Sequence, residues 1–148
     1  MANRGHMNTR KGIYTPRKPD KYVGDPNAIR YMSSWELSVH QFFDANPNVL
    51  RWSSEEIAIP YIKPTDGKVH RYFPDYWIEF KEKSGNIKQE IIEVKPHAQT
   101  REPRRQGKKR KTQLYEQVTY AINVAKWQSA TSFCTKRGIV FRILTEKD

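Results

Sequence analysis

The chain has 148 residues, with 27 Lys or Arg against 16 Asp or Glu and a formal net charge of +11. This length suits one domain with tails, and an apolar content of 36% indicates that part of the chain lies outside the core. We expect no membrane segment and no signal peptide, because no apolar run is long enough. A single cysteine, Cys134, excludes an intrachain disulfide and a cysteine-based zinc site, which favours a reducing compartment.

The excess positive charge is confined to two segments. Residues 1–30 carry a net charge of +5 and residues 96–111 one of +6, together the whole net charge. Both segments are poor in aliphatic residues and contain Pro or Gly. We therefore predict a flexible basic N-terminal arm (1–30), in which residues 5–7 also fit a cloning remnant, and a domain over 31–148 with a basic loop at 96–111.

The basic loop favours a polyanionic partner. Its positive charge serves either solubility alone or the binding of phosphates, and nucleic acid fits better than a membrane because no amphipathic basic helix accompanies it. The loop residues that we expect to contact DNA are Arg101, Arg104, Arg105, Lys108, Lys109, Arg110 and Lys111.

In chain order, the first regular element after the arm is a helix over 33–46, with Ser33 or Ser34 as N-cap and Asn46-Pro47 ending it. Extended segments and a second helix follow. The turn signal over 64–67 predicts a hairpin, and the apolar run within 88–95 is typical of a covered central strand. The remaining predicted elements are strands over 49–62, 69–73, 75–80 and 139–144 and a long helix over 112–136, whose apolar stripe holds Leu114, Val118, Ala121, Ile122, Ala125 and Phe133. This order predicts an α/β fold with a mixed central sheet.

Three charged residues interrupt the strands. Asp75 opens one strand, and Glu93 and Lys95 share a face of the next because side chains alternate along a strand. Two converging carboxylates repel each other unless a cation neutralises them, and oxygen ligands suit Mg²⁺. Bound Mg²⁺ and a neighbouring lysine supply what phosphodiester hydrolysis needs. The alternative is that Glu93 and Lys95 form an ordinary charge pair.

Pro74-Asp75, separated by seventeen residues from Glu93-Val94-Lys95, resembles the motif of the PD-(D/E)xK nuclease superfamily. Within it, the chain is similar to the head-completion nucleases of T4-like bacteriophages over roughly residues 8–145. The stretches that carry the similarity are Ser33–Leu37, Asn46–Glu56, His70–Trp77 and Ile92–Pro96.

The resemblance implies a restriction-endonuclease-like αβββαβ core and a Mg²⁺-dependent nuclease, with Mn²⁺ as a substitute. By position, Asp75 and Glu93 would be metal ligands and Lys95 the residue that orients water and phosphate. Glu36 matches an extra metal-binding and catalytic carboxylate on the first helix, with a solvated helix charge as the alternative. Gln113 and Gln117 are further candidates, although their spacing departs from the superfamily pattern.

We therefore expect an enzyme, a DNA endonuclease or exonuclease that acts on packaged double-stranded DNA during phage head completion, before head–tail joining. Its expected partners are phage head, portal or neck proteins, and its expected location is the host cytoplasm during assembly, or the virion. The alternatives are a head or neck protein that binds DNA or the portal without cutting, and a junction-resolving nuclease of the same fold.

Overall fold

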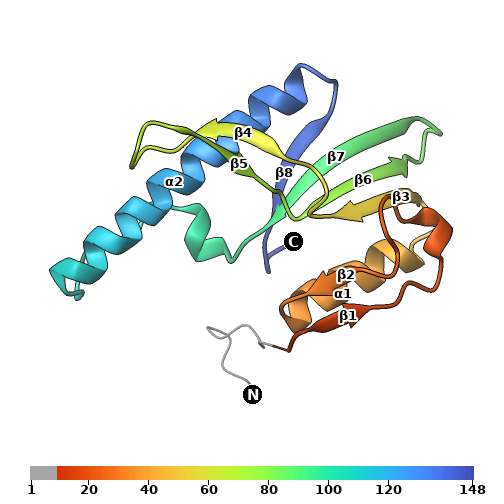
Figure 1. Cartoon of the computed structure of the whole chain (residues 1–148), viewed down its shortest axis with the longest axis horizontal. Helices are drawn as coiled ribbons and strands as arrows, with labels where there is room; N and C mark the ends of the chain where they lie inside the picture. The colour runs from red at the N-terminus through yellow and green to blue at the C-terminus, as the bar shows by residue number, and fades with distance from the viewer. Residues whose placement is uncertain (1–9) are drawn as a thin grey trace. The chain divides into compact units, whose positions relative to one another are not determined.

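The computed structural model describes residues 10–148 (Figure 1). The chain forms two compact units, Met1–Glu56 with Tyr76–Gln89 and Ile57–Asp75 with Glu90–Asp148. This division differs from the predicted arm and single domain. Residues 1–9, including the segment 5–7 noted as a cloning remnant, lie outside the described residues.

In the first unit, residues 10–30 are folded, so the prediction of a flexible arm is wrong for this part of the chain. Strands β1 (Gly12–Tyr14) and β2 (Ile29–Tyr31) pair antiparallel, and the short 3-10 helix η1 (Pro19–Lys21) lies between them. The segment is held by Asp44, which accepts hydrogen bonds from the Tyr14 hydroxyl at 2.6 Å and from the backbone N–H groups of Arg17 and Lys18.

Helix α1 (Ser34–Ala45) confirms the first predicted helix. Ser33 is its N-cap, and the Ser33 hydroxyl accepts a hydrogen bond from the backbone N–H of Glu36, which satisfies one unpaired donor of the first turn. At its other end, the Lys21 ammonium donates to the backbone carbonyls of Phe43, Asp44 and Asn46. A cation at this end suits the negative end of the helix dipole.

The core of the first unit is an aromatic cluster around Trp52, which is fully buried on strand β3 (Val49–Ser54). Strand β6 (Tyr76–Lys81) pairs antiparallel with β3 and contributes Tyr76. The rings in contact with Trp52 are those of Tyr14, Tyr22, His40, Phe43 and Tyr76. Trp52 is therefore a core residue.

The main sheet is mixed, as predicted. Its strands are hydrogen-bonded in the order β3-β6-β7-β8, with β7 (Ile87–Val94) parallel to β8 (Val140–Leu144). The predicted strand over 49–62 is in fact two strands, because β3 ends at Ser54 and Glu55 takes a positive φ of 55°. The residues after it enter a separate hairpin.

The second unit contains this hairpin, formed by β4 (Ile59–Ile62) and β5 (Val69–Tyr72), as the turn signal predicts. The hairpin lies against the long helix α2 (Arg110–Thr135), which also contacts β8 (Figure 1). The segment between β7 and α2 includes the 3-10 helix η2 (His97–Thr100). Because α2 begins at Arg110, two residues of the predicted basic loop, Arg110 and Lys111, belong to its first turn.

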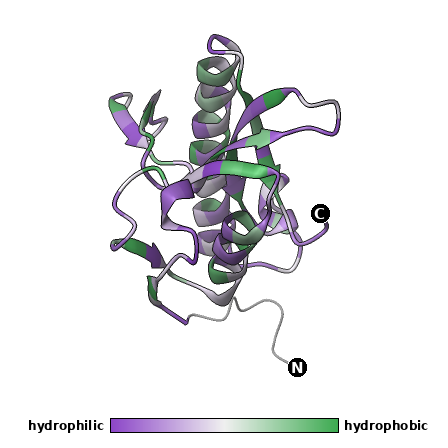
Figure 2. Ribbon diagram, turned by 90° about the vertical axis from the view of Figure 1, so that its right-hand side faces the viewer, coloured by the Kyte–Doolittle hydropathy of each residue, from purple (hydrophilic) through white to green (hydrophobic). Residues whose placement is uncertain are grey.

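The predicted apolar stripe of α2 is wrong in its first half. Leu114 and Val118 are 66% and 37% exposed, whereas the buried residues of the helix are Asn123, Ala130 and Cys134. Apolar and polar residues are interleaved along the helices (Figure 2). Among the described residues, no helix combines the length and apolar character needed to cross a membrane.

Candidate functional site

Asp75 contacts the strand that carries the Glu-x-Lys pair. It follows β5 and Pro74, and its Oδ2 atom accepts a hydrogen bond of 2.7 Å from the backbone N–H of Val94. Val94 lies between Glu93 and Lys95, so this bond places the Asp75 carboxylate beside the predicted partners. All of these residues belong to the second unit.

Glu93 is a buried carboxylate, only 7% exposed. Its Oε1 atom accepts a hydrogen bond of 2.7 Å from the Tyr72 hydroxyl, and its Oε2 atom lies 3.6 Å from the ammonium nitrogen of Lys95. A buried charge is costly unless it is paired and hydrogen-bonded, and Glu93 has both kinds of partner. The structure therefore brings Asp75, Glu93 and Lys95 together.

The hydroxyl of Tyr72 experiences the negative charges of both carboxylates, Glu93 and Asp75. Burial raises the pKa of the Tyr72 hydroxyl far above its ordinary value, and the negative charges of Glu93 and Asp75 raise this pKa further. The hydroxyl therefore stays protonated and remains a hydrogen-bond donor. The Trp127 side chain lowers this pKa, although its buried indole N–H has no hydrogen-bond partner among the described residues.

Lys126, on α2, is a neighbour that the sequence analysis missed. Its ammonium nitrogen lies 5.8 Å and 5.6 Å from the ring centroids of Tyr61 and Tyr72. Burial lowers the pKa of Lys126, and the negative charge of Glu93 opposes this shift. The signal in the sequence is a lysine four residues after Ile122 and next to Ala125, at the edge of the predicted apolar stripe.

Glu36 belongs to the first unit, whereas Asp75, Glu93 and Lys95 belong to the second. Its Oε1 atom accepts a hydrogen bond of 3.2 Å from the backbone N–H of Met32, just before α1. Burial raises the pKa of Glu36, the hydrogen bond from Met32 lowers it, and the charge of Glu55 raises it. Glu36 is thus a partly buried carboxylate with a local role in capping α1.

The donor set at Asp75 and Glu93 suits a hard divalent cation. Among the described residues, no group of three or more His, Cys, Asp or Glu side chains is gathered that could hold a metal ion. Mg²⁺, however, commonly takes only one or two carboxylates from a protein and completes its shell with water and substrate phosphate. Two carboxylates beside a lysine therefore fit such an ion.

The Arg and Lys residues of the basic loop are exposed, apart from the half-buried Lys108, which forms an ion pair with Glu116 at 2.6 Å. Gln113 donates hydrogen bonds of 2.8 Å to the backbone carbonyls of Arg105 and Lys108. Gln117 accepts a bond of 3.3 Å from the Arg105 guanidinium. The two glutamines thus hold the loop against the start of α2. Arg101, Arg104, Lys109, Arg110 and Lys111 are left with exposed side chains.

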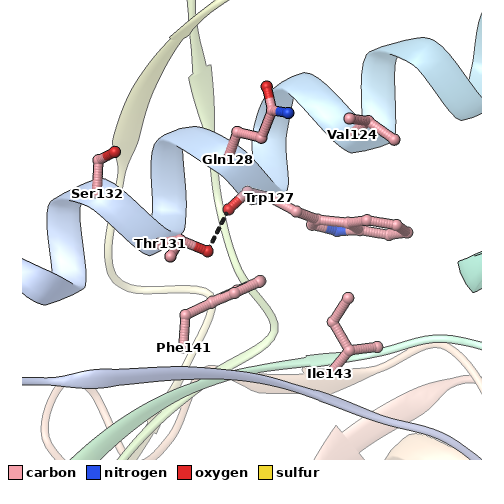
Figure 3. A pocket seen from close by; sticks show the side chains of 7 residues that line it. All are labelled: Val124, Trp127, Gln128, Thr131, Ser132, Phe141 and Ile143. Carbon is pink, nitrogen blue, oxygen red and sulfur yellow. Dashed lines mark hydrogen bonds between the residues drawn. The ribbon is translucent and has the colours of Figure 1, made fainter.

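An open pocket of about 590 Å³ lies between α2 and β8. The indole of Trp127 and the side chains of Val124, Phe141 and Ile143 project into it (Figure 3). The Thr131 hydroxyl, also in its wall, donates to the backbone carbonyl of Trp127 at 2.8 Å. The lining does not include Asp75, Glu93 or Lys95, so the pocket is separate from these three side chains.

The mixed sheet, with an aspartate held against a Glu-x-Lys strand, is the arrangement of restriction-endonuclease-like nucleases. Residues 46–146 match the family model described as TnsA-like endonuclease N terminal, and the chain belongs to this endonuclease family. It is similar to the head completion nuclease of Enterobacteria phage T4, with 40% identity over 139 residues, which cover 91% of this chain and 90% of the relative. The nuclease resemblance read from the sequence is confirmed.

Proposed function

We propose that this protein is a Mg²⁺-dependent DNA nuclease that acts on packaged DNA during phage head completion, before the head joins the tail. The hydrogen bond from Val94 to Asp75 is the observation that carries the proposal, because it holds one carboxylate beside the strand that bears Glu93 and Lys95. The T4 relative is named a head completion nuclease, which supports the nuclease activity and the stage of assembly.

Asp75 and Glu93 would hold the divalent ion, with Mn²⁺ as a substitute for Mg²⁺. When bound, such an ion polarises a phosphate and lowers the pKa of water. Tyr72 keeps Glu93 oriented through its hydrogen bond to Oε1, which leaves the other carboxylate oxygen toward Lys95. Lys95 then orients the attacking water and stabilises charge on the phosphate oxygens. Glu36 would be an additional metal-binding and catalytic carboxylate.

The exposed residues of the basic loop support a grip on the DNA backbone, since Lys and Arg bind phosphates without reading sequence. The loop follows Lys95 in the chain, so a duplex held there would pass close to the carboxylates. Head, portal or neck proteins are the proposed protein partners. The proposed location is the host cytoplasm during assembly, or the virion.

A plasmid-nicking assay tests the proposal. The wild-type protein should nick supercoiled plasmid with Mg²⁺ or Mn²⁺ and not with EDTA, and Asp75→Asn should lower the rate by at least about 100-fold. Glu90→Gln is the matched control, because Glu90 lies on the same strand and pairs with Arg142. Nicking by purified Asp75→Asn at the wild-type rate would refute the site. A wild-type protein that binds DNA and never cuts it would favour a structural head or neck role.

A further inference from the structure

Lys126 occupies an unusual position for a lysine. It lies on α2 with its ammonium nitrogen over the faces of Tyr61, from β4, and Tyr72, from β5. Tyr72 in turn donates to the buried carboxylate of Glu93. A half-buried ammonium loses hydration that aromatic faces replace only in part, and the nearby Glu93 carboxylate is already shared with Lys95.

Two further lysines stand beside the partners of Lys126. Lys63 follows Tyr61 by two residues, and its backbone N–H still pairs across the β4–β5 hairpin, so the two side chains lie on one face. Lys95 pairs with Glu93, the carboxylate that Tyr72 holds. The positive charges of Lys95 and Lys63 lower the pKa of Lys126, after the larger effect of burial. Lys63 directly follows β4, and Lys95 directly follows β7. Three separate elements of the second unit therefore bring ammonium groups toward one place, where they outnumber the carboxylates of Asp75 and Glu93.

Like charges that are held near one another are stabilised when an anion binds between them. A lysine ammonium is a compact charge with three donors, which suits the tetrahedral oxygens of a phosphate. The family is one of endonucleases, whose substrate supplies phosphates in a regular row. A phosphate next to the one being cleaved would accept hydrogen bonds from these donors.

We propose that Lys126 and Lys63, together with Lys95, form a phosphate-binding subsite beside Glu93 that holds the DNA backbone. This inference rests on the proposed function for its substrate, a DNA strand, and assigns two residues that the nuclease motif does not include. Lys126 touches the phosphate in this proposal, and Lys63 closes the subsite from the hairpin. The subsite fixes which phosphate lies over the carboxylates.

The test measures binding without cleavage. A short fluorescein-labelled duplex is titrated with the full-length protein in EDTA over a range of KCl concentrations, and anisotropy gives the Kd. Each lost phosphate contact should reduce the slope of log Kd against log salt by about 0.9. Lys126→Met and Lys63→Met should each show this reduction and a several-fold weaker Kd, whereas Lys126→Arg should keep most of the wild-type affinity. Lys136→Met, at the far end of α2, is the control and should match wild type.

The inference is overturned if Lys126→Met and Lys63→Met have the salt slope and Kd of Lys136→Met. Circular dichroism checks that each variant is folded, and should Lys126→Met fail to fold, Lys63→Met and Lys126→Arg still decide the question. The assay contains no metal and records no cutting. A protein that never nicks plasmid but shows the reduced slopes would therefore refute the nuclease and keep the subsite. A protein that nicks plasmid but shows unchanged salt slopes in the lysine variants would support the nuclease and refute the subsite.

Discussion

The hydroxyl of Tyr72 donates a 2.7 Å hydrogen bond to the Oε1 atom of Glu93, and both side chains are buried. The bond joins a hairpin strand to the strand of the Glu-x-Lys pair. Since the pKa of Tyr72 is raised, the hydroxyl keeps its proton throughout the ordinary pH range. Glu93 therefore always has a donor that fixes one of its two oxygens.

Replacing Tyr72 with Phe removes this donor and keeps the ring. We expect Tyr72→Phe to weaken Mn²⁺ binding and slow nicking by about 10-fold or more, because outer partners of metal ligands orient them. The lost bond should lower the free energy of unfolding by about 1–3 kcal/mol, since it leaves a buried carboxylate oxygen unsatisfied. Calorimetric Mn²⁺ titration and urea unfolding measure the two effects. Tyr115→Phe, at an exposed position, is the control, and Mn²⁺ affinity equal to that control would contradict the role given to Tyr72.

Glu36→Gln separates the capping role of Glu36 from a role in cleavage. Because burial raises the pKa of this carboxyl, the protonated form favours the folded state. The associated stability is fully present below the unfolded pKa of about 4.5 and is lost as the pH rises through the raised folded value. Gln stays neutral and can still accept from Met32, so Glu36→Gln should have an equal or higher Tm at neutral pH. If Glu36 also serves cleavage, nicking should fall by at least about 10-fold. An unchanged nicking rate would mean that Glu36 acts only in capping α1.

Gln113→Ala tests whether α2 holds the basic loop. The substitution removes two hydrogen bonds of 2.8 Å to the carbonyls of Arg105 and Lys108. We expect trypsin to cut the loop several-fold faster, because local opening then costs less free energy. Limited proteolysis followed by mass spectrometry measures this rate. Gln106→Ala, at an exposed position in the same loop, provides the comparison, and equal cleavage rates for the two variants would argue against the anchoring role.

His40 should make stability depend on pH. The ring is fully buried against Tyr76 and the carbonyl of Arg30, and burial lowers its pKa. The stability gained from neutral His40 is present above about pH 6.5 and is lost as the pH falls through the lower folded value. Within that window the loss approaches about 1.4 kcal/mol per pH unit. Urea unfolding of wild type and His40→Gln between neutral and mildly acidic pH measures it, and parallel pH curves for the two proteins would refute the assignment.

Several features follow from local patterns in the sequence. The Ser33 cap of α1, the turn of the β4–β5 hairpin and the apolar run of β7 each depend on residues that are close together in the chain. The expectation that Asp75 meets the Glu-x-Lys strand also follows locally, because strands joined by a turn usually pair. These signals sufficed for the mixed sheet and for the proximity of Asp75 to the strand that carries Glu93 and Lys95.

Other features depended on residues far apart in the chain. Residues 10–30 look like an arm because their own composition supplies no periodic pattern, yet the Tyr14 hydroxyl reaches Asp44, thirty residues away. Lys126 comes near Glu93 only because α2 packs against the hairpin, and Leu114 is exposed although it fits the apolar stripe of the helix. The sequence alone therefore determined the Ser33 cap of α1, the hairpin turn, the apolar run of β7 and the Asp75–Glu93–Lys95 motif. Only the tertiary structure decided which groups donate hydrogen bonds to Asp44 and which cations approach Glu93. Contacts between distant segments produce no periodic pattern in the sequence of either segment.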